Sequence, residues 1–208
     1  AVVYGRPCIV TAVGQRMKAT VELTNEPIFQ LNAPDVQITN YQKPMNQLGQ
    51  GDLPKGAKFV EIAIKNFFYR HPERLVKDLK IKSRDFSPSS RNDKFGLKIT
   101  TSSEFNSQFG FGSSSASTVC VIKALSELTG AKLSDKTIFN LTYKTVLDIQ
   151  GKGSGFDVAA AIYGGTLYFV TPGKVIKPLN LSSLPLIVGY SGIKIDTVTI
   201  VNQVKERA

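Results

Sequence analysis

The stretch FNSQFGFGSSSASTVCVIKALSELTG, residues 105–130, decides the fold, because a loop rich in glycine and serine runs directly into an amphipathic helix. Glycine allows the backbone to approach an anion closely, and serine offers hydroxyl groups. A helix that begins there directs unpaired N–H groups and the positive end of its dipole at whatever binds. The loop therefore predicts a phosphate site, whose candidate contacts are Gly110, Phe111, Gly112, Ser113, Ser114, Ser115 and Ala116.

The rest of this stretch supports a helix and excludes two common nucleotide motifs. Apolar residues recur at helical spacing and predict a buried stripe, formed by Val121, Ile122, Leu125 and Leu128. Gly130 is placed to end the helix. The motif G-x-x-x-x-G-K-[ST] is absent, and G-x-G-x-x-G fails because Ser115 and Phe156 stand where a third glycine belongs. A solvated helix start without a ligand remains an alternative for the loop taken alone.

A second glycine-rich loop, GKGSGFDVAAAIYGG at 151–165, places three glycines before Asp157 and a helix of small residues from Val158 to Tyr163. A single acid at a helix start commonly accepts backbone N–H groups of the first turn. Alternatively, the two glycine-rich helix starts face one cleft. One would then hold phosphates, and the other would present a carboxylate that orients or deprotonates a hydroxyl nucleophile.

Four segments together resemble a known family. GFGSSSAS is similar to the G-L-G-S-S-A phosphate loop of the GHMP kinases, which act on galactose, homoserine, mevalonate and phosphomevalonate, with Phe111 in place of leucine. SGFDVAAAIYGG resembles the family's catalytic-aspartate segment, especially that of the members that act on phosphomevalonate. The opening AVVYGRPCIVTAV resembles the members that act on mevalonate, and VGYSGIKIDTVTIVNQV resembles the start of the second domain. The resemblance spans nearly the whole chain, in family order.

The resemblance implies an α+β, two-domain fold, in which 1–182 form an N-terminal ATP-binding domain with a mixed sheet and helices, and 183–208 begin a C-terminal domain. It implies ATP and Mg²⁺ as cofactors, Asp157 as the catalytic carboxylate, and Ser114 as a contact of the metal. On the substrate side it implies Ser154, Gly155, Lys194 and Thr197. The implied activity is phosphorylation of the mevalonate hydroxyl; phosphomevalonate as substrate and a non-catalytic binding protein remain alternatives.

The resemblance also shows departures. A strand carrying P-G-K, with a lysine near the active site, precedes A-V-V-Y-G in the family, and a third glycine-rich motif lies in the C-terminal domain. We therefore expect the sequence to be a fragment. A magnesium-binding glutamate is expected at the position of Val146, and Asp148 is the nearest acid.

Composition is typical of a globular enzyme. The chain is 42% hydrophobic, and Cys8 and Cys120 lie in apolar contexts without metal-ligand spacing, as buried thiols in a reducing compartment would. No apolar run approaches the roughly 20 residues of a membrane span, and the start does not read as a signal peptide. We expect a cytoplasmic enzyme with a small-molecule substrate and no membrane partner, and we leave a homodimer open.

The formal charge of +10 raises a nucleic-acid alternative, since basic and aromatic residues alternate between Lys58 and Lys98. Phe67, Phe68 and the apolar residues after them recur at the spacing of a buried helical face, which favours a core with a solvated charged face. We therefore expect no nucleic-acid partner. His71, the one histidine, lies in this stretch rather than near either loop, so a Ser–His–Asp site is poorly supported.

Periodicity and turn residues predict the remaining elements. We expect strands within 2–23, irregular or short-strand structure over 26–56, helices over 58–68 and 72–79, and a strand over 95–101. We also expect a helix from an N-cap at Ser134 to Leu147, a hairpin of 166–170 with 175–176, a buried strand over 186–189, and a domain boundary near 181–185.

Overall fold

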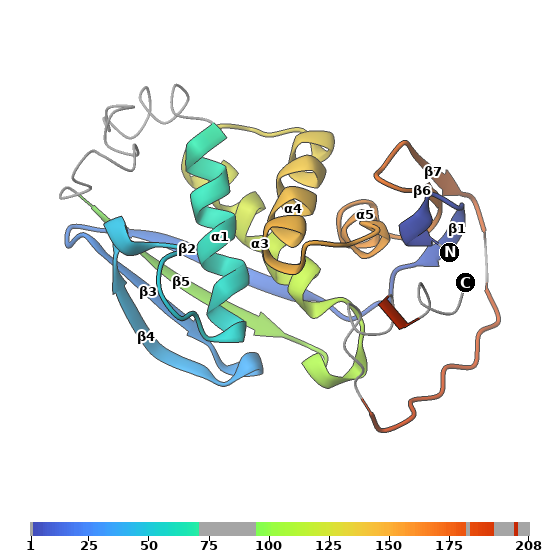
Figure 1. Ribbon diagram of the computed structural model, residues 1–208, viewed down its shortest axis with the longest axis horizontal. Coiled ribbons are helices and arrows are strands. Elements are labelled where there is room, and N and C mark those ends of the chain that lie inside the picture. The colour runs from blue at the N-terminus through green and yellow to red at the C-terminus, as the bar shows by residue number, and fades with distance from the viewer. Residues whose placement is uncertain (1, 71–94, 182–183, 194–201, 204–208) are drawn as a thin grey trace.

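The computed structural model of the chain describes residues 2–70, 95–181, 184–193 and 202–203, and it shows an α+β architecture with two sheets (Figure 1). The larger sheet has the strand order β2 (Met17–Thr24), β5 (Gly96–Ser103), β3 (Ile28–Ala33), β4 (Ile38–Pro44). β3 and β5 run parallel and the outer pairs run antiparallel, so the sheet is mixed. The expected α+β fold with a mixed sheet is confirmed.

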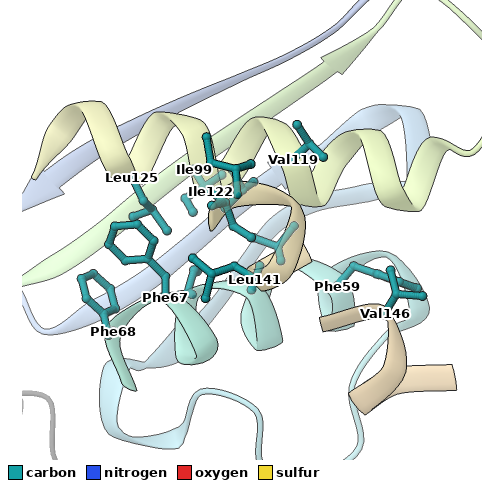
Figure 2. Packing of buried hydrophobic residues seen from close by; sticks show 14 of the residues in the cluster. Phe59, Phe67, Phe68, Ile99, Val119, Ile122, Leu125, Leu141 and Val146 are labelled. Carbon is teal, nitrogen blue, oxygen red and sulfur yellow. The ribbon is translucent and has the colours of Figure 1, made fainter. Parts of the chain in front are cut away.

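Two helices lie against one face of this sheet, α1 (Lys55–Arg70) and α3 (Ser113–Leu128), and a third, α4 (Asp135–Gln150), packs against both of them (Figure 1). Figure 2 shows how their apolar side chains interdigitate, with Phe67 of α1, Ile122 of α3 and Leu141 of α4 in one cluster. Each of these three is at most 1% exposed. Full burial of one such side chain contributes about 1.5–3 kcal/mol, so this layer contributes substantially to the stability of the fold.

The smaller sheet is antiparallel, in the order β1 (Cys8–Thr11), β6 (Thr166–Val170), β7 (Val175–Leu179). α5 (Phe156–Tyr163) contacts β6 and β1 on one side and α3 and α4 on the other, so it joins the two halves of the core. Short 3-10 turns complete the described elements: η1 (Val2–Tyr4), η2 (Pro34–Val36), η3 (Met45–Gln47) and η5 (Ser107–Phe109).

A buried carboxylate attaches α1 to the hairpin of β3 and β4. Glu61 is 0% exposed and accepts hydrogen bonds from the Tyr41 hydroxyl (2.6 Å), the Gly49 N–H (2.7 Å) and Lys43 Nζ (3.2 Å). The charge is therefore compensated where water cannot reach it. Burial, and next the hydrogen bond to Glu61, raise the pKa of Tyr41 to about 12.

Most predicted elements are confirmed with adjusted ends. Ser134 caps α4 by accepting the Thr137 N–H (3.2 Å), and Gly130, with φ +62°, follows the end of α3. The segment 26–56 holds the short strands β3 and β4. The buried strand expected over 186–189 is wrong: these residues form no strand, and Ile187 and Val188 are exposed, because no strand or helix among the described residues covers them.

Some of the other structural expectations can be compared with the structure, and others concern residues outside the described ranges. Phe67 and Phe68 are core residues, as predicted, and the helix expected over 72–79 and His71 lie outside the described residues. Cys8 and Cys120 are free thiols and half-buried rather than fully buried, and burial raises the pKa of both. Among the described residues, none of the helices has the length and apolar character that crossing a membrane requires.

Candidate active site at two glycine-initiated helices

The phosphate loop, Gly110 to Ala116, follows the short helix η5 and leads into α3. The Asn106 side chain caps η5 by accepting the Gln108 N–H (2.8 Å), and Gly110 follows with φ +76°. Gly112, with φ +74°, is the N-cap of α3, a left-handed conformation that glycine adopts without strain. Glycine has no side chain to cap the helix, so the first N–H groups of α3 are left for a ligand, as an anion site requires.

The three serines of α3's first turn differ in exposure. Ser113 is 9% exposed and Ser115 is 2% exposed, whereas Ser114 is half-buried. Of the three serines, Ser114 is therefore the most exposed. The Ser114 carbonyl accepts a hydrogen bond from the Thr118 hydroxyl (2.8 Å), which fixes the turn behind it.

Asp157 lies where the second glycine-rich helix start meets the first. The N-cap of α5 is Gly155 (φ +84°), so Asp157 lies in the first turn rather than at the cap. Its Oδ1 accepts the Val158 N–H (3.0 Å), and its Oδ2 accepts the hydroxyl of Ser115 in α3 (2.5 Å). A Cβ at Gly112 would lie 3.2 Å from Asp157 Cβ, so a larger residue at 112 would crowd the carboxylate. The structure thus brings the two loops together at this acid.

The loop that leads to Asp157 is held by side chains that the sequence analysis did not select. The Tyr143 hydroxyl donates to the Gly153 carbonyl (2.9 Å), and the Thr171 hydroxyl lies 3.1 Å from the Ser154 carbonyl. The Tyr143 ring stacks on Phe139 (5.9 Å between centroids) and packs under Gly155. Burial raises the pKa of Tyr143, which keeps its hydroxyl protonated as a donor. The signal available in the sequence was an aromatic pair four residues apart on a helix that precedes a glycine-rich loop.

The structure describes only some of the other predicted site residues. Ser154 is 7% exposed, and Gly155 is buried as the cap of α5. Lys194 and Thr197 lie outside the described residues. Val146 is 5% exposed and packs against Gly153, where its side chain supplies no ligand.

The nearest acid to Val146, Asp148, is occupied elsewhere. Its Oδ2 accepts from Asn66 of α1 (2.9 Å) and from Lys144 of α4 (2.5 Å). The contact with Asn66 attaches α4 to α1. Of the two acids Asp148 and Asp157, it is therefore Asp157 that the structure places beside the phosphate loop.

The donor set of the site suits a metal carried by a nucleotide. Within the described ranges, no group of three or more His, Cys, Asp or Glu side chains is arranged to hold an ion. The Ser114 hydroxyl and the Asp157 carboxylate supply oxygen ligands at adjoining helix starts. Mg²⁺ keeps several waters and is commonly held by one or two carboxylates together with substrate phosphates. The residues present therefore fit a magnesium ion that arrives with phosphates.

An aromatic cluster flanks the phosphate loop. The Phe109 ring lies 5.9 Å from that of Phe111 and 5.3 Å from that of Tyr190, and Phe105 lies 6.1 Å from Phe111, all between centroids. Phe111 and Phe109 are 38% and 44% exposed. Their rings connect the loop to the extended segment 184–193.

Comparison with known proteins agrees with this geometry. Residues 70–165, which contain both glycine-rich loops, match the family model for the GHMP kinases N terminal domain. The chain is 29% identical over 210 residues to the mevalonate kinase of Pyrococcus furiosus, covering 100% of this chain and 58% of that protein. It is 31% identical over 173 residues to that of Methanocaldococcus jannaschii, covering 80% of this chain and 48% of the relative.

A solved structure supports the fold. The crystal structure of the Methanococcus jannaschii mevalonate kinase superimposes with a TM-score of 0.61 at 27% identity, covering 86% of this chain and 50% of that chain. The chain spans about half the length of the curated relatives that it matches, from 48% to 58%.

Proposed function

Because the chain belongs to the GHMP kinase family and resembles mevalonate kinases along its whole length, we propose that the protein transfers the γ-phosphoryl group of ATP to the hydroxyl of mevalonate. One observation carries this proposal beyond the likeness. A carboxylate, Asp157, is hydrogen-bonded to the first turn of the helix that follows the phosphate loop. Phosphoryl transfer to an alcohol needs a proton acceptor beside a phosphate site, and this contact supplies that arrangement.

The nucleotide's phosphates bind at Gly110 to Ala116 in this proposal. The N–H groups at the start of α3 donate to phosphate oxygens, and the positive end of the helix dipole favours their charge. The positive φ angles of Gly110 and Gly112 allow the backbone to turn toward the anion. Ser114, the most exposed of the three serines, contacts a phosphate oxygen or the metal.

The acceptor hydroxyl lies against Asp157. An alcohol does not ionise near neutral pH, so its proton has to leave as the bond to phosphorus forms. Each oxygen of Asp157 accepts one hydrogen bond in the structure, and a carboxylate oxygen can accept two. The carboxylate therefore keeps the capacity to take the substrate's proton while its orientation is fixed. Ser154, Gly155, Lys194 and Thr197 form the substrate side in this proposal.

Mg²⁺ is the second cofactor that we propose, held by Ser114 and the phosphates of ATP. Bound there, it would neutralise the charge that develops on the transferring phosphoryl group. The chain's own contribution is positional: α3 orients the phosphates and α5 orients the carboxylate.

ATP consumption by the full-length protein tests the proposal, with mevalonate and phosphomevalonate assayed in parallel. Turnover with mevalonate supports it, and turnover with phosphomevalonate alone would favour the alternative that the wording GSGFDVAAA suggests. ATP binding without turnover would favour a non-catalytic member of the family, to which Val146 in place of an acid already points. The cytoplasmic location, the homodimer and the assignment of 183–208 to a second domain stay predictions.

A further inference from the structure

Ser115 contacts Asp157, although the phosphate loop does not require a hydroxyl at this position. The motif G-L-G-S-S-A ends in alanine where this chain has its third serine. The Ser115 side chain is 2% exposed, and its Oγ lies 2.5 Å from Asp157 Oδ2, across 42 residues of sequence. A buried hydrogen bond to an ionised group is among the stronger neutral-donor interactions in a protein.

A serine hydroxyl has one hydrogen to donate. In this structure the hydrogen is directed at Asp157, because a carboxylate accepts and does not donate when ionised. Ser115 therefore does not donate to a phosphate oxygen at the same time. This separates its role from that of Ser114, whose half-buried hydroxyl lies one residue earlier.

We propose that Ser115 is a positioning residue for the phosphoryl-transfer reaction, which holds the Asp157 carboxylate in the orientation that accepts the substrate's proton. The inference rests on the proposed function, since it assigns to Asp157 the role of base. Two hydrogen bonds define the orientation: the Ser115 hydroxyl donates to Oδ2, and the Val158 N–H donates to Oδ1. Of these, the Ser115 hydroxyl is the contact that a side-chain substitution removes without changing the backbone.

The consequence is a coupling between the two helix starts. Because the same turn of α3 carries the phosphate contacts and Ser115, the position of the base follows the position of the phosphate site. Without the hydroxyl, the carboxylate samples other rotamers, and a smaller fraction of bound substrate meets the base in a reactive geometry. This lowers kcat and leaves substrate binding nearly unchanged.

The test is Ser115→Ala in the full-length protein. We expect kcat to fall about tenfold, equivalent to about 1.4 kcal/mol of barrier, while KM for ATP and for mevalonate changes less than about twofold. Ser126→Ala is the matched control, because Ser126 also lies on α3 and is also 2% exposed. Its hydroxyl oxygen accepts a hydrogen bond from the Leu133 N–H (2.8 Å), away from the site. We expect this control to lose stability and keep kcat.

A double-variant cycle separates positioning from phosphate binding. In an Asp157→Asn background, Ser115→Ala has no base left to position, so we expect it to lower the residual kcat by less than about twofold. A phosphate contact would instead keep its full effect in that background.

Four results would overturn the inference: an unchanged kcat in Ser115→Ala, a rise of KM for ATP at constant kcat, an equal loss of kcat in Ser126→Ala, or a full effect of Ser115→Ala in the Asp157→Asn background. A parent protein without ATP-dependent phosphorylation of either substrate would instead overturn the proposed function, and the positioning role with it. The parent assay therefore distinguishes the two failures.

Discussion

Gly155→Ala tests whether the aromatic pair beneath the second loop constrains Gly155, the residue that caps α5. Gly155 has φ +84°, and a Cβ there would lie 2.9 Å from Tyr143 Cδ2, 3.1 Å from its Cε2 and 3.3 Å from Phe139 Cζ. The left-handed conformation costs a non-glycine residue about 1–2 kcal/mol. Overpacking against two stacked rings adds about 1–3 kcal/mol. We therefore expect Gly155→Ala to lower the free energy of unfolding by about 2–5 kcal/mol.

Gly151 offers a matched control in the same loop. It also has a positive φ, +70°, but no atom lies within 4 Å of the position of its Cβ. Gly151→Ala therefore incurs the conformational cost without the overpacking. Thermal unfolding of both variants, followed by circular dichroism, should give a Tm for Gly155→Ala roughly 2–12 °C below that of Gly151→Ala, because 1 kcal/mol shifts Tm by about 2–4 °C at this size. Equal Tm values would refute the conclusion that the rings constrain Gly155.

Three further predictions concern catalysis and pH. Asp157→Asn should keep the Kd for ATP, measured calorimetrically, and lose about a hundredfold or more of kcat, since it keeps the size of the side chain and removes the base; a normal kcat would exclude Asp157 as the base. Ser114→Ala should lose about tenfold or more of kcat/KM for ATP while staying folded, because it removes the accessible hydroxyl at the phosphate site; an unchanged value would contradict the assignment. Tyr41 keeps its proton up to about pH 12 in the folded protein and loses it near pH 10 when unfolded, so its contribution to stability is complete below pH 10 and lost as the pH rises toward 12. Unfolding midpoints from pH 9 to 12 should therefore fall more steeply than those of Tyr41→Phe, and parallel curves would contradict this.

Local sequence signals were sufficient for the phosphate loop and its helix. Glycines at 110 and 112, the serines after them and a stripe at helical spacing all depend on residues close in sequence, so the loop and α3 could be predicted together. The strands β3 and β4 were harder to predict. The Asn, Gln and Pro residues of 26–56 hide the alternation, and β3 becomes a buried strand because it pairs with β5, far away in sequence.

The contacts that complete the site could not be predicted, because they join distant segments. Nothing near Ser115 indicates that its hydroxyl donates to Asp157, and nothing near Tyr143 indicates that it holds Gly153. The strand expected over 186–189 fails for a related reason. Its apolar run is compatible with burial, but burial needs a partner, and the described residues around it supply none.

The arrangement also explains how a site with few charged ligands could support phosphoryl transfer. The reaction depends on the distance between the phosphate site and the base, and the proposed phosphate site and the proposed base, Asp157, lie on the first turns of two helices that pack against each other. Val158 and Ala159, both 0% exposed, set that packing from α5, and Val121 and Ile122 belong to the same core from α3. A change in this core would therefore displace the base relative to the phosphates without touching either. In the proposed mechanism, the catalytic geometry is consequently a property of helix packing as much as of the two glycine-rich loops.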